Sequence, residues 1–389
     1  MAEIDEMCRL DRARASVLAE LHEVLEGETL RAQRHGPHVQ DLWRRTAQHI
    51  GGGKLMRPML LLEVLDAFRA EGSAGPAGSD ASRGSDAARW SDAAHGSDPG
   101  SGAGDAVALC CAAALEILHY AFLLHDDVID HDLVRRGDDN LVGALHRHGR
   151  AGGDDGASLH WARSAGILMG DLLLSRAHQL LARVDVPAPM RAELLDLLDH
   201  AVTESAAGEF LDVGLADGMI PPARREIDTM TRSKTAVYSV ELPLGMACVL
   251  AGAGAEVRAA LEDAGRCIGI AFQLQDDALS AFGAEHHHGK DPWSDFREGK
   301  QTRIMDAARS TASWPAVAEL LGRSDLTDAQ GLRLRGLLVD CGARDRVAEE
   351  IEALLDEARR ILHDGPARIP AAVVEVIEQQ MRRLEGRTR

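Results

Sequence analysis

Two apolar runs in this chain end in paired aspartates, and the first of them adds a third acid. The run AFLLHDDVID places Asp126 and Asp130 four residues apart, with Asp127 beside the first. On a helix, this spacing brings Asp126 and Asp130 to one face, with Asp127 about 100° away. Acids near a helix C-terminus repel each other and the helix dipole unless cations neutralise them. Hard ions such as Mg²⁺ suit the arrangement, because they bind one or two carboxylates together with a substrate phosphate.

The second run, FQLQDDALS, repeats the pattern with Asp276 and Asp277 but has Ser280 in the third position. A lone pair of aspartates is usually a solvated helix end, and the duplication argues against that interpretation. Two apolar helices that each end in acids are predicted to form facing walls of one cavity.

Groups that bind phosphate accompany the acids. The stretch GGGKLMRP places glycines, Lys54 and Arg57 at the start of a helix with Pro58 in its first turn. Cations and free backbone N–H groups can there face one anion. An ordinary helix start would explain the glycines and the proline alone. Further cations follow the acid runs in an otherwise acidic chain: Arg135, Arg136, Lys234, Lys290 and Lys300.

The elements that carry these residues are predicted to be helices, because apolar residues repeat at helical spacing and strand-like alternation is absent. The sequence predicts an all-α domain over 1–389. Helices are expected near residues 11–26, 38–50, 57–70, 105–132, 161–184, 189–215, 223–252, 257–282, 302–322, 326–341, 344–363 and 369–386. Residues 147–160 are predicted to form a loop. Residues 71–104 are predicted to be a disordered insertion, because their GSDAAR-like repeats cannot bury enough apolar surface.

Bulk composition excludes several classes of protein. A chain of 389 residues, 45% of them hydrophobic, suffices for a substantial core. Its formal charge of −19 argues against partners such as nucleic acid or anionic lipid. Six irregularly spaced cysteines favour a reducing cytoplasmic location over a disulfide or zinc framework. We expect no signal peptide and no membrane span, since no window reaches about 18 uninterrupted apolar residues.

Five motifs in this order resemble the trans-isoprenyl diphosphate synthases, also called the polyprenyl synthetase family, over most of the chain. GGGKLMRP is similar to the family's G-G-K-x-x-R-P segment, and HDDVIDHDLVRRG to its first aspartate-rich motif with a trailing arginine pair. SKTAVYS resembles its Lys-Thr motif. FQLQDDALS and GKDPWSDFREGKQT resemble its second aspartate-rich motif and the lysine-bearing loop that follows. Each motif alone would be weak, and their order makes the likeness specific.

The resemblance implies the isoprenoid synthase fold, a helical bundle around a deep central cavity, usually as a homodimer. It implies a prenyltransferase that condenses isopentenyl diphosphate head to tail with an allylic diphosphate. Three Mg²⁺ ions, held by Asp126, Asp130 and Asp276, would stabilise the charge that develops on pyrophosphate. The implied catalytic residues are Asp126, Asp127, Asp130, Lys234, Thr235, Gln273, Asp276 and Asp277.

The same resemblance divides the other site residues between two diphosphates. The allylic leaving group would be gripped by Arg135, Lys234 and Lys290, with Lys300 in the same substrate-binding set. Isopentenyl diphosphate would bind Lys54, Arg57, Arg136 and His119, although His119 can equally be a packed core histidine. The carbocation would lie against Gln273, Thr235 and the ring of Tyr238.

Several positions depart from the family's usual pattern. Leu55 stands where arginine is frequent, DDNLVG replaces a common Pro-Thr element, and Glu209 stands where glutamine is usual. We interpret Ser280 as tolerable, because Asp276 alone can hold an ion whose shell is completed by waters and pyrophosphate oxygens. The triplet from His286 to His288 is interpreted as solvated loop histidines.

Product length in the family depends on the residues four and five positions before the first acids. These are Phe122 and Ala121, which predict geranylgeranyl diphosphate (C20), with farnesyl diphosphate (C15) as the nearest alternative. Two other interpretations stay open. A terpene synthase-like enzyme is disfavoured by Lys54 and Arg57, and a non-catalytic subunit of a heteromeric synthase is disfavoured by the intact first acid cluster.

Overall fold

The computed structural model describes residues 2–72, 101–135, 137–151, 153–283 and 292–385, with backbone alone for 2–7 and 101–103. Most of the predicted insertion at 71–104 therefore lies outside the described residues. Two compact units make up the chain. Unit 1 comprises Met1–Asp196 and Met246–Ala253, and unit 2 comprises Leu197–Gly245 and Gly254–Arg389. The prediction of a single domain stays a prediction.

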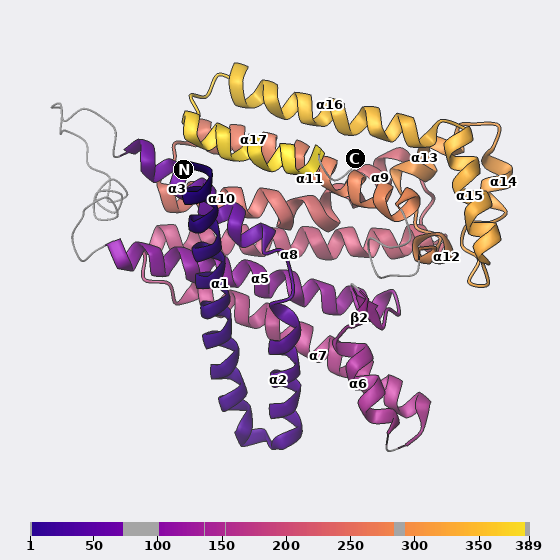
Figure 1. The fold of residues 1–389 in the computed structure, drawn as a ribbon, viewed down its shortest axis with the longest axis horizontal. Helices are drawn as coiled ribbons and strands as arrows, with labels where there is room; N and C mark the ends of the chain where they lie inside the picture. The colour runs from indigo at the N-terminus through magenta and orange to yellow at the C-terminus, as the bar shows by residue number, and fades with distance from the viewer. Residues whose placement is uncertain (1, 73–100, 136, 152, 284–291, 386–389) are drawn as a thin grey trace. The chain divides into compact units, whose positions relative to one another are not determined.

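Unit 1 is built from long helices and one small hairpin. Its elements are α1 (Ala2–Ala32), the 3₁₀ turn η1 (Gln33–His35), α2 (Pro37–Ile50), α3 (Met56–Gly72), α5 (Ser101–Ile129), β1 (Val134–Arg135), β2 (Asp138–Asp139), α6 (Leu141–Arg150) and α7 (Asp155–Ala182). Helices α1 and α2 lie side by side, drawn in indigo in Figure 1. The boundary with unit 2 falls within α8 (Ala188–Ala216) and α10 (Leu242–Ala251).

Helix α5 forms the centre of unit 1, and residues 111–115 are completely buried. Helix α7 packs along it, and two glycines one turn apart allow the close approach. A Cβ at Gly170 would lie 2.3 Å from His125 Nε2, and one at Gly166 would lie 2.9 Å from Val128 Cγ2. Both contacts fall on the segment of α5 that carries the first aspartates, so α7 fixes the position of that segment.

Unit 2 is a second helical assembly. After α8 it contains α9 (Arg224–Thr231), the π-helix η2 (Arg232–Glu241), α11 (Ala255–Phe282), α12 (Ser294–Glu298), α13 (Arg303–Arg309), α14 (Trp314–Ala318), α15 (Asp328–Asp340), α16 (Ala343–Asp364) and α17 (Ala371–Glu385). Helix α16 lies against α11, and Figure 1 draws it in gold. The core beneath α12 and α15 buries Trp293, Phe296, Leu334 and Leu338.

The helical class is confirmed, but several boundaries differ from prediction. The helix predicted at 11–26 is longer at both ends, because α1 runs from Ala2 to Ala32. The loop predicted at 147–160 is wrong at both ends. Helix α6 continues to Arg150 because its apolar face is buried, and α7 begins at Asp155 behind Asp154, whose carboxylate accepts two backbone N–H bonds. The helix predicted at 302–322 is interrupted between α13 and α14, where Thr311 N–H bonds back to Ala308. The helix predicted at 223–252 contains η2.

Two segments are long and apolar enough to cross a membrane by length and composition alone, Gly104–Ile129 and Arg224–Ala251. Their most apolar windows are 72% and 78% buried inside the protein, which is the burial expected of core helices. All six cysteines are free thiols.

Candidate active site

The glycine-rich segment between α2 and α3 exposes Lys54 and buries Arg57. Leu55 has a left-handed backbone with a φ of 52°, and its side chain is 1% exposed. For a residue with a side chain this conformation costs of order 1–3 kcal/mol. The chain holds it by burying Leu55 and by a bond at 2.9 Å from Arg14 Nη2 to the Gly53 carbonyl. The turn therefore places a lysine and an arginine at the first turn of α3.

The first acid cluster lies at the C-terminal end of α5. Asp126 and Asp130 are half-buried, Asp127 is buried, and the Asp130 N–H bonds to the Asp126 carbonyl at 2.8 Å. Arg135 donates from Nε to Asp127 Oδ1 at 3.0 Å and from Nη2 to Asp126 Oδ2 at 3.1 Å. Burial lowers the pKa of Arg135, but the two carboxylates outweigh burial and raise it above its usual value. A permanent positive charge thus gathers two of the three acids.

The hairpin of β1 and β2 brings Arg135 back to the helix end. Its turn contains Gly137 at a φ of 86°. Asn140 closes the hairpin, because its N–H donates to the Leu133 carbonyl at 3.1 Å and its Oδ1 accepts from the Gly143 N–H at 2.7 Å. A Cβ at Gly143 would lie 2.0 Å from the Leu133 carbonyl oxygen. The segment DDNLVG, in which the chain departs from the family pattern, therefore forms a defined hairpin and helix cap.

The side chains before the acids on α5 differ in exposure. Ala121 is completely buried, whereas Phe122 and His119 are half-buried. Tyr120 is buried next to the cluster, and burial together with the charge of Asp127 raises the pKa of its phenol. Tyr120 therefore stays protonated beside the acids, a position that sequence reasoning missed.

In unit 2, Asp212 on α8 gathers two lysines. Its Oδ2 accepts from Lys234 Nζ at 2.7 Å and from Lys300 Nζ at 3.0 Å. Burial raises the pKa of Asp212, but the two ammonium groups outweigh burial and hold it below its usual value. Glu209, almost one turn earlier, places Oε2 2.9 Å from Lys234 Nζ. The two lysines thus share one buried carboxylate, and Lys234 also contacts a second.

The π-helix η2 positions Lys234, and two neighbouring helices approach it closely. A Cβ at Gly208 would lie 2.2 Å from the Lys234 backbone nitrogen. A Cβ at Gly269 on α11 would lie 2.7 Å from an alanine side chain of η2. Thr235 is half-buried and Tyr238 is buried in the same element. π-Helical turns are rare and occur often at functional sites.

The second acid pair lies on α11, where Asp276 and Asp277 are half-buried. Burial raises the pKa of Asp277 to about 8, against the hydrogen bond that its Oδ1 accepts from Gln273 Nε2 at 2.7 Å. Asp277 is therefore largely protonated at neutral pH. One turn on, the Ser280 hydroxyl donates to Asp295 Oδ2. The third position thus holds a donor that reaches a carboxylate on α12.

Helix α12 carries Asp295 and precedes Lys300, and aromatic packing anchors it. Trp293 and Phe296 are almost completely buried and stack with ring centroids 6.0 Å apart. A Cβ at Gly331 on α15 would lie 2.3 Å from the Trp293 ring. The Lys300 N–H bonds to the Asp295 carbonyl at 3.0 Å, so the lysine is tied to the anchored segment.

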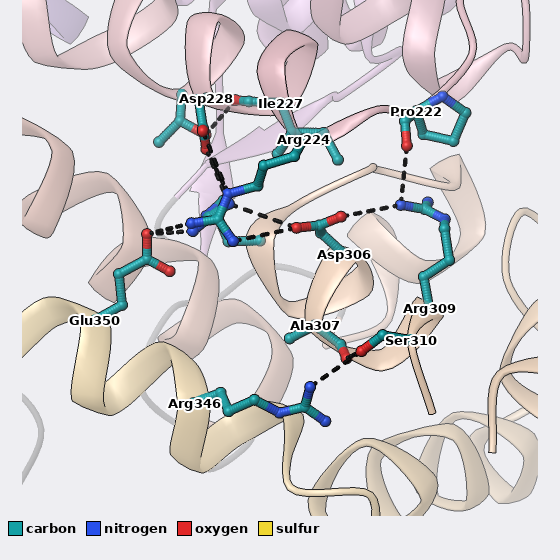
Figure 2. Close-up of polar contacts among 12 residues, drawn as sticks. Pro222, Arg224, Ile227, Asp228, Asp306, Ala307, Arg309, Ser310, Arg346 and Glu350 are labelled. Atoms are coloured by element: carbon teal, nitrogen blue, oxygen red, sulfur yellow. Dashed lines mark hydrogen bonds and ion pairs between the residues drawn. The ribbon is translucent and has the colours of Figure 1, made fainter. Parts of the chain in front are cut away.

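An ionic network fixes the helices on either side of the lysines. Arg303 on α13, with a side chain 1% exposed, pairs with Asp228 at 2.9 Å, with Asp306 at 3.5 Å and with Glu350. Figure 2 shows Arg224 among the same three carboxylates. The network joins α9, which leads into η2, to α13, which follows the second lysine, and to α16. It therefore holds both lysine-bearing segments in place.

Within unit 1 the structure brings Arg135 to Asp126 and Asp127, and within unit 2 it brings Lys234 and Lys300 to one carboxylate. Arg136, Lys290 and the histidines 286–288 lie outside the described residues. Asp212 and Asp295 were not singled out by sequence reasoning. Asp212 follows Glu209 at a helical spacing in an acidic chain, which is too common a pattern to mark it. What marks Asp212 is its pairing with two lysines that are distant in sequence, and only the fold shows that pairing.

Within the part of the chain that the structure describes, no group of three or more His, Cys, Asp or Glu side chains is assembled to hold a metal ion. The donor chemistry nevertheless fits magnesium. Asp126 and Asp130 offer carboxylate oxygens from one helix face, and Asp276 offers another on α11. Magnesium binds through one or two carboxylates and completes its shell with waters and phosphate oxygens.

Several known proteins are similar to this chain in sequence. The sequence model of the polyprenyl synthetase family matches residues 40–332. Geranylgeranyl diphosphate synthase of Methanosarcina mazei is 28% identical over 258 residues, which cover 66% of this chain and 73% of that protein. Geranylfarnesyl diphosphate synthase of Aeropyrum pernix is 30% identical over 274 residues, which cover 68% of this chain and 78% of that protein.

A solved structure extends the likeness over nearly the whole chain. Geranylgeranyl pyrophosphate synthase from Corynebacterium glutamicum, complexed with isoprenyl diphosphate and magnesium, superposes with a TM-score of 0.79 at 27% identity. The match covers 96% of this chain and 97% of that one, which confirms the all-α isoprenoid synthase fold. The protein belongs to the polyprenyl synthetase family, whose members are prenyltransferases.

Proposed function

We propose that this protein is a cytoplasmic, magnesium-dependent synthase that condenses isopentenyl diphosphate with allylic diphosphates to a short all-trans chain, geranylgeranyl diphosphate. The observation that carries the proposal is the coexistence of two kinds of charged site. The acids of α5 with Arg135 suit metal-assisted ionisation, and Lys54 with Arg57 supplies cations for a second diphosphate. An enzyme that only ionises one diphosphate has no need of the second set.

The roles proposed for the residues that hold the allylic diphosphate follow the family resemblance. Asp126, Asp130 and Asp276 would hold magnesium, which when bound draws charge from the diphosphate as its C–O bond breaks. Lys234 and Lys300, aligned by Asp212, would donate to the departing pyrophosphate, as would Lys290. Gln273, Thr235 and Tyr238 would face the allylic cation.

The isopentenyl diphosphate would bind the loop before α3. Lys54 and Arg57 would hold its phosphates, together with Arg136 and His119, while its double bond attacks the cation. Pyrophosphate leaving the first substrate would accept the proton that is lost as the new double bond forms.

Product length would be set by Ala121 and Phe122 on α5. Ala121 is a small side chain and is buried, whereas Phe122 is large and half-buried. A small residue beside a large one at these two positions supports C20. The C15 product is the alternative, and the similarity to a geranylfarnesyl diphosphate synthase makes C25 a third product to look for. Ala121→Phe should shorten the product and Phe122→Ala should lengthen it. Unchanged chromatograms of the radiolabelled products from both variants would refute this assignment.

The decisive experiment incubates the purified protein with Mg²⁺, isopentenyl diphosphate and each of the C5, C10 and C15 allylic diphosphates. Condensation to a C20 product is expected. Pyrophosphate release without elongation would favour a terpene synthase-like enzyme, and complete inactivity would favour a non-catalytic subunit.

We also propose that the enzyme is a homodimer. On α7, Trp161, Leu168 and Leu172 form a stripe on one face and are 46%, 61% and 46% exposed. Apolar surface of this kind commonly marks a protein interface. Light scattering should give a dimer for the native protein and a monomer for Leu168→Glu, and a monomeric native protein would contradict the proposal.

A further inference from the structure

Glu209 contacts Lys234 at a point where α8 and η2 pack closely. Its neighbour Gly208 brings the backbone of α8 against that of η2, since a Cβ there would lie 2.2 Å from the Lys234 nitrogen. The carboxylate is only 20% exposed, and its Oε2 is 2.9 Å from Lys234 Nζ. The contact is therefore built into the packing of the two helices.

The charges around the lysines do not favour an incoming anion. Lys234 contacts Glu209 and Asp212, while Lys300 contacts Asp212 and also Glu298 at 3.6 Å. Among the described residues, three carboxylates thus surround these two ammonium groups, which gives these five groups a formal charge of −1. A diphosphate that approaches the lysines must compete with these carboxylates.

The two acids on α8 differ in how readily each can move away from the lysines. Asp212 bridges both lysines and its side chain is 6% exposed, so it aligns the pair. Glu209 contacts one lysine and is three times as exposed. Glu209 is therefore the carboxylate that can turn away when an anion takes its place on Lys234.

We propose that Glu209 is a specificity-determining residue that competes with the allylic diphosphate for Lys234 and so lowers the affinity of the lysine pair for diphosphates. The inference rests on the proposed function, in which Lys234 binds the leaving group. A neutral side chain at this position would remove one negative charge from the cluster and leave the ion pair between Lys234 and Asp212 in place. Weaker binding of the leaving group eases the release of pyrophosphate after each condensation.

The test compares Glu209→Gln with the native enzyme by calorimetric titration of pyrophosphate in excess Mg²⁺. Removing one charge within contact distance of the lysine should tighten the Kd about tenfold. The matched control is Glu352→Gln, which removes the same charge from an exposed position on α16 of the same unit. The control should shift the Kd less than twofold. Thermal melts of both variants should stay near the native value.

Steady-state kinetics separate this inference from the function on which it rests. For Glu209→Gln, KM for the allylic substrate should fall while KM for isopentenyl diphosphate stays unchanged. A pyrophosphate Kd for Glu209→Gln that is equal to or weaker than that of the control overturns the inference, as does a lack of pyrophosphate binding by either protein. Tight pyrophosphate binding without condensation by the native enzyme would refute the proposed synthase but not the role of Glu209.

Discussion

The acid cluster of unit 1 and the lysine cluster of unit 2 are built with opposite signs. In unit 1, one cation, Arg135, bonds two carboxylates, those of Asp126 and Asp127. In unit 2, one anion, Asp212, bonds two ammonium groups, those of Lys234 and Lys300. Each counter-ion gathers charges that would otherwise repel one another. The gathered groups suit different partners, since carboxylates bind metal ions and ammonium groups bind phosphate.

The two clusters also differ in how firmly the single counter-ion is placed. Arg135 comes from a short hairpin that Asn140 and Gly143 close. Asp212 lies near the C-terminal end of the long helix α8, and its lysines lie on segments that the Arg303 network fixes. Unit 1 thus depends on one side chain from a turn, whereas unit 2 distributes the same task over several helices.

The largest expected effect tests whether the surplus acid of unit 1 serves chemistry. Asp130→Ser leaves the Arg135 contacts in place and removes one carboxylate from the metal-binding face. We expect kcat/KM to fall by about three orders of magnitude, because the charge on the leaving group loses a stabilising ion. Asp138→Asn, on the exposed strand β2, is the matched control and should stay within twofold. Activity of Asp130→Ser within tenfold of native would remove the metal role from this cluster.

The two clusters should differ in how much stability is lost when a charge that pairs with their buried carboxylates is removed. Arg135→Gln leaves Asp127 buried without its cation, which should lower the free energy of unfolding by about 3 kcal/mol. Lys300→Gln should cost less than half as much, because Asp212 keeps its bond to Lys234. Urea unfolding of both variants in metal-free buffer measures the difference. Equal losses would show that the sharing of Asp212 gives unit 2 no advantage.

A smaller effect concerns pH and Asp277. Its pKa is raised from 3.8 to about 8, so the folded protein keeps a proton that the unfolded chain releases. Stability contributed by the native residue is therefore lost as pH rises from about 4 towards 8. Asp277→Asn removes this loss while keeping an oxygen for Gln273.

Without magnesium, Asp277→Asn should raise Tm by about 2–5 °C at pH 8. The gain should vanish near pH 4, where the unfolded chain is protonated as well. Calorimetric scans at the two pH values provide the measurement and its internal control. A lower Tm for the variant at pH 8 would mean that the native carboxylate is ionised and paired in the folded protein.

Sequence alone predicted the aspartates of the two acid runs, because each run belongs to a single apolar helix. The apolar periodicity of α5 and α11 located Asp126, Asp130 and Asp276. Asp126 and Asp276 lie within these helices, and Asp130 directly follows the last residue of α5. The hairpin was missed because strands of two residues show no alternation. Asp212 was missed because its importance lies in contacts between segments 22 and 88 residues apart.

Two elements differ from the sequence prediction because of packing within their own unit. Residues 147–150 look like a polar loop because His and Arg dominate them, but the buried apolar side chains that precede them extend α6 through this stretch. Helix η2 has the apolar pattern of an ordinary α-helix in sequence. The close approach of α8 and α11 to it, at two glycines, is visible only in the structure. Such packing constraints are properties of the assembled unit.

The smallest effect is expected at Ser280, the third position of the second acid run. Ser280→Ala removes the hydroxyl that reaches Asp295 and should lower kcat less than threefold, because α12 stays anchored by its aromatic residues. Ser280→Asp places a second charge against Asp295 and should cost about three- to tenfold through repulsion. Both losses are far smaller than the loss expected for Asp130→Ser. If Ser280→Asp matched the loss of Asp130→Ser, or raised kcat above native, the third position would matter equally in both runs. The contrast between an acid cluster built for metal and a lysine cluster built for phosphate would then fail.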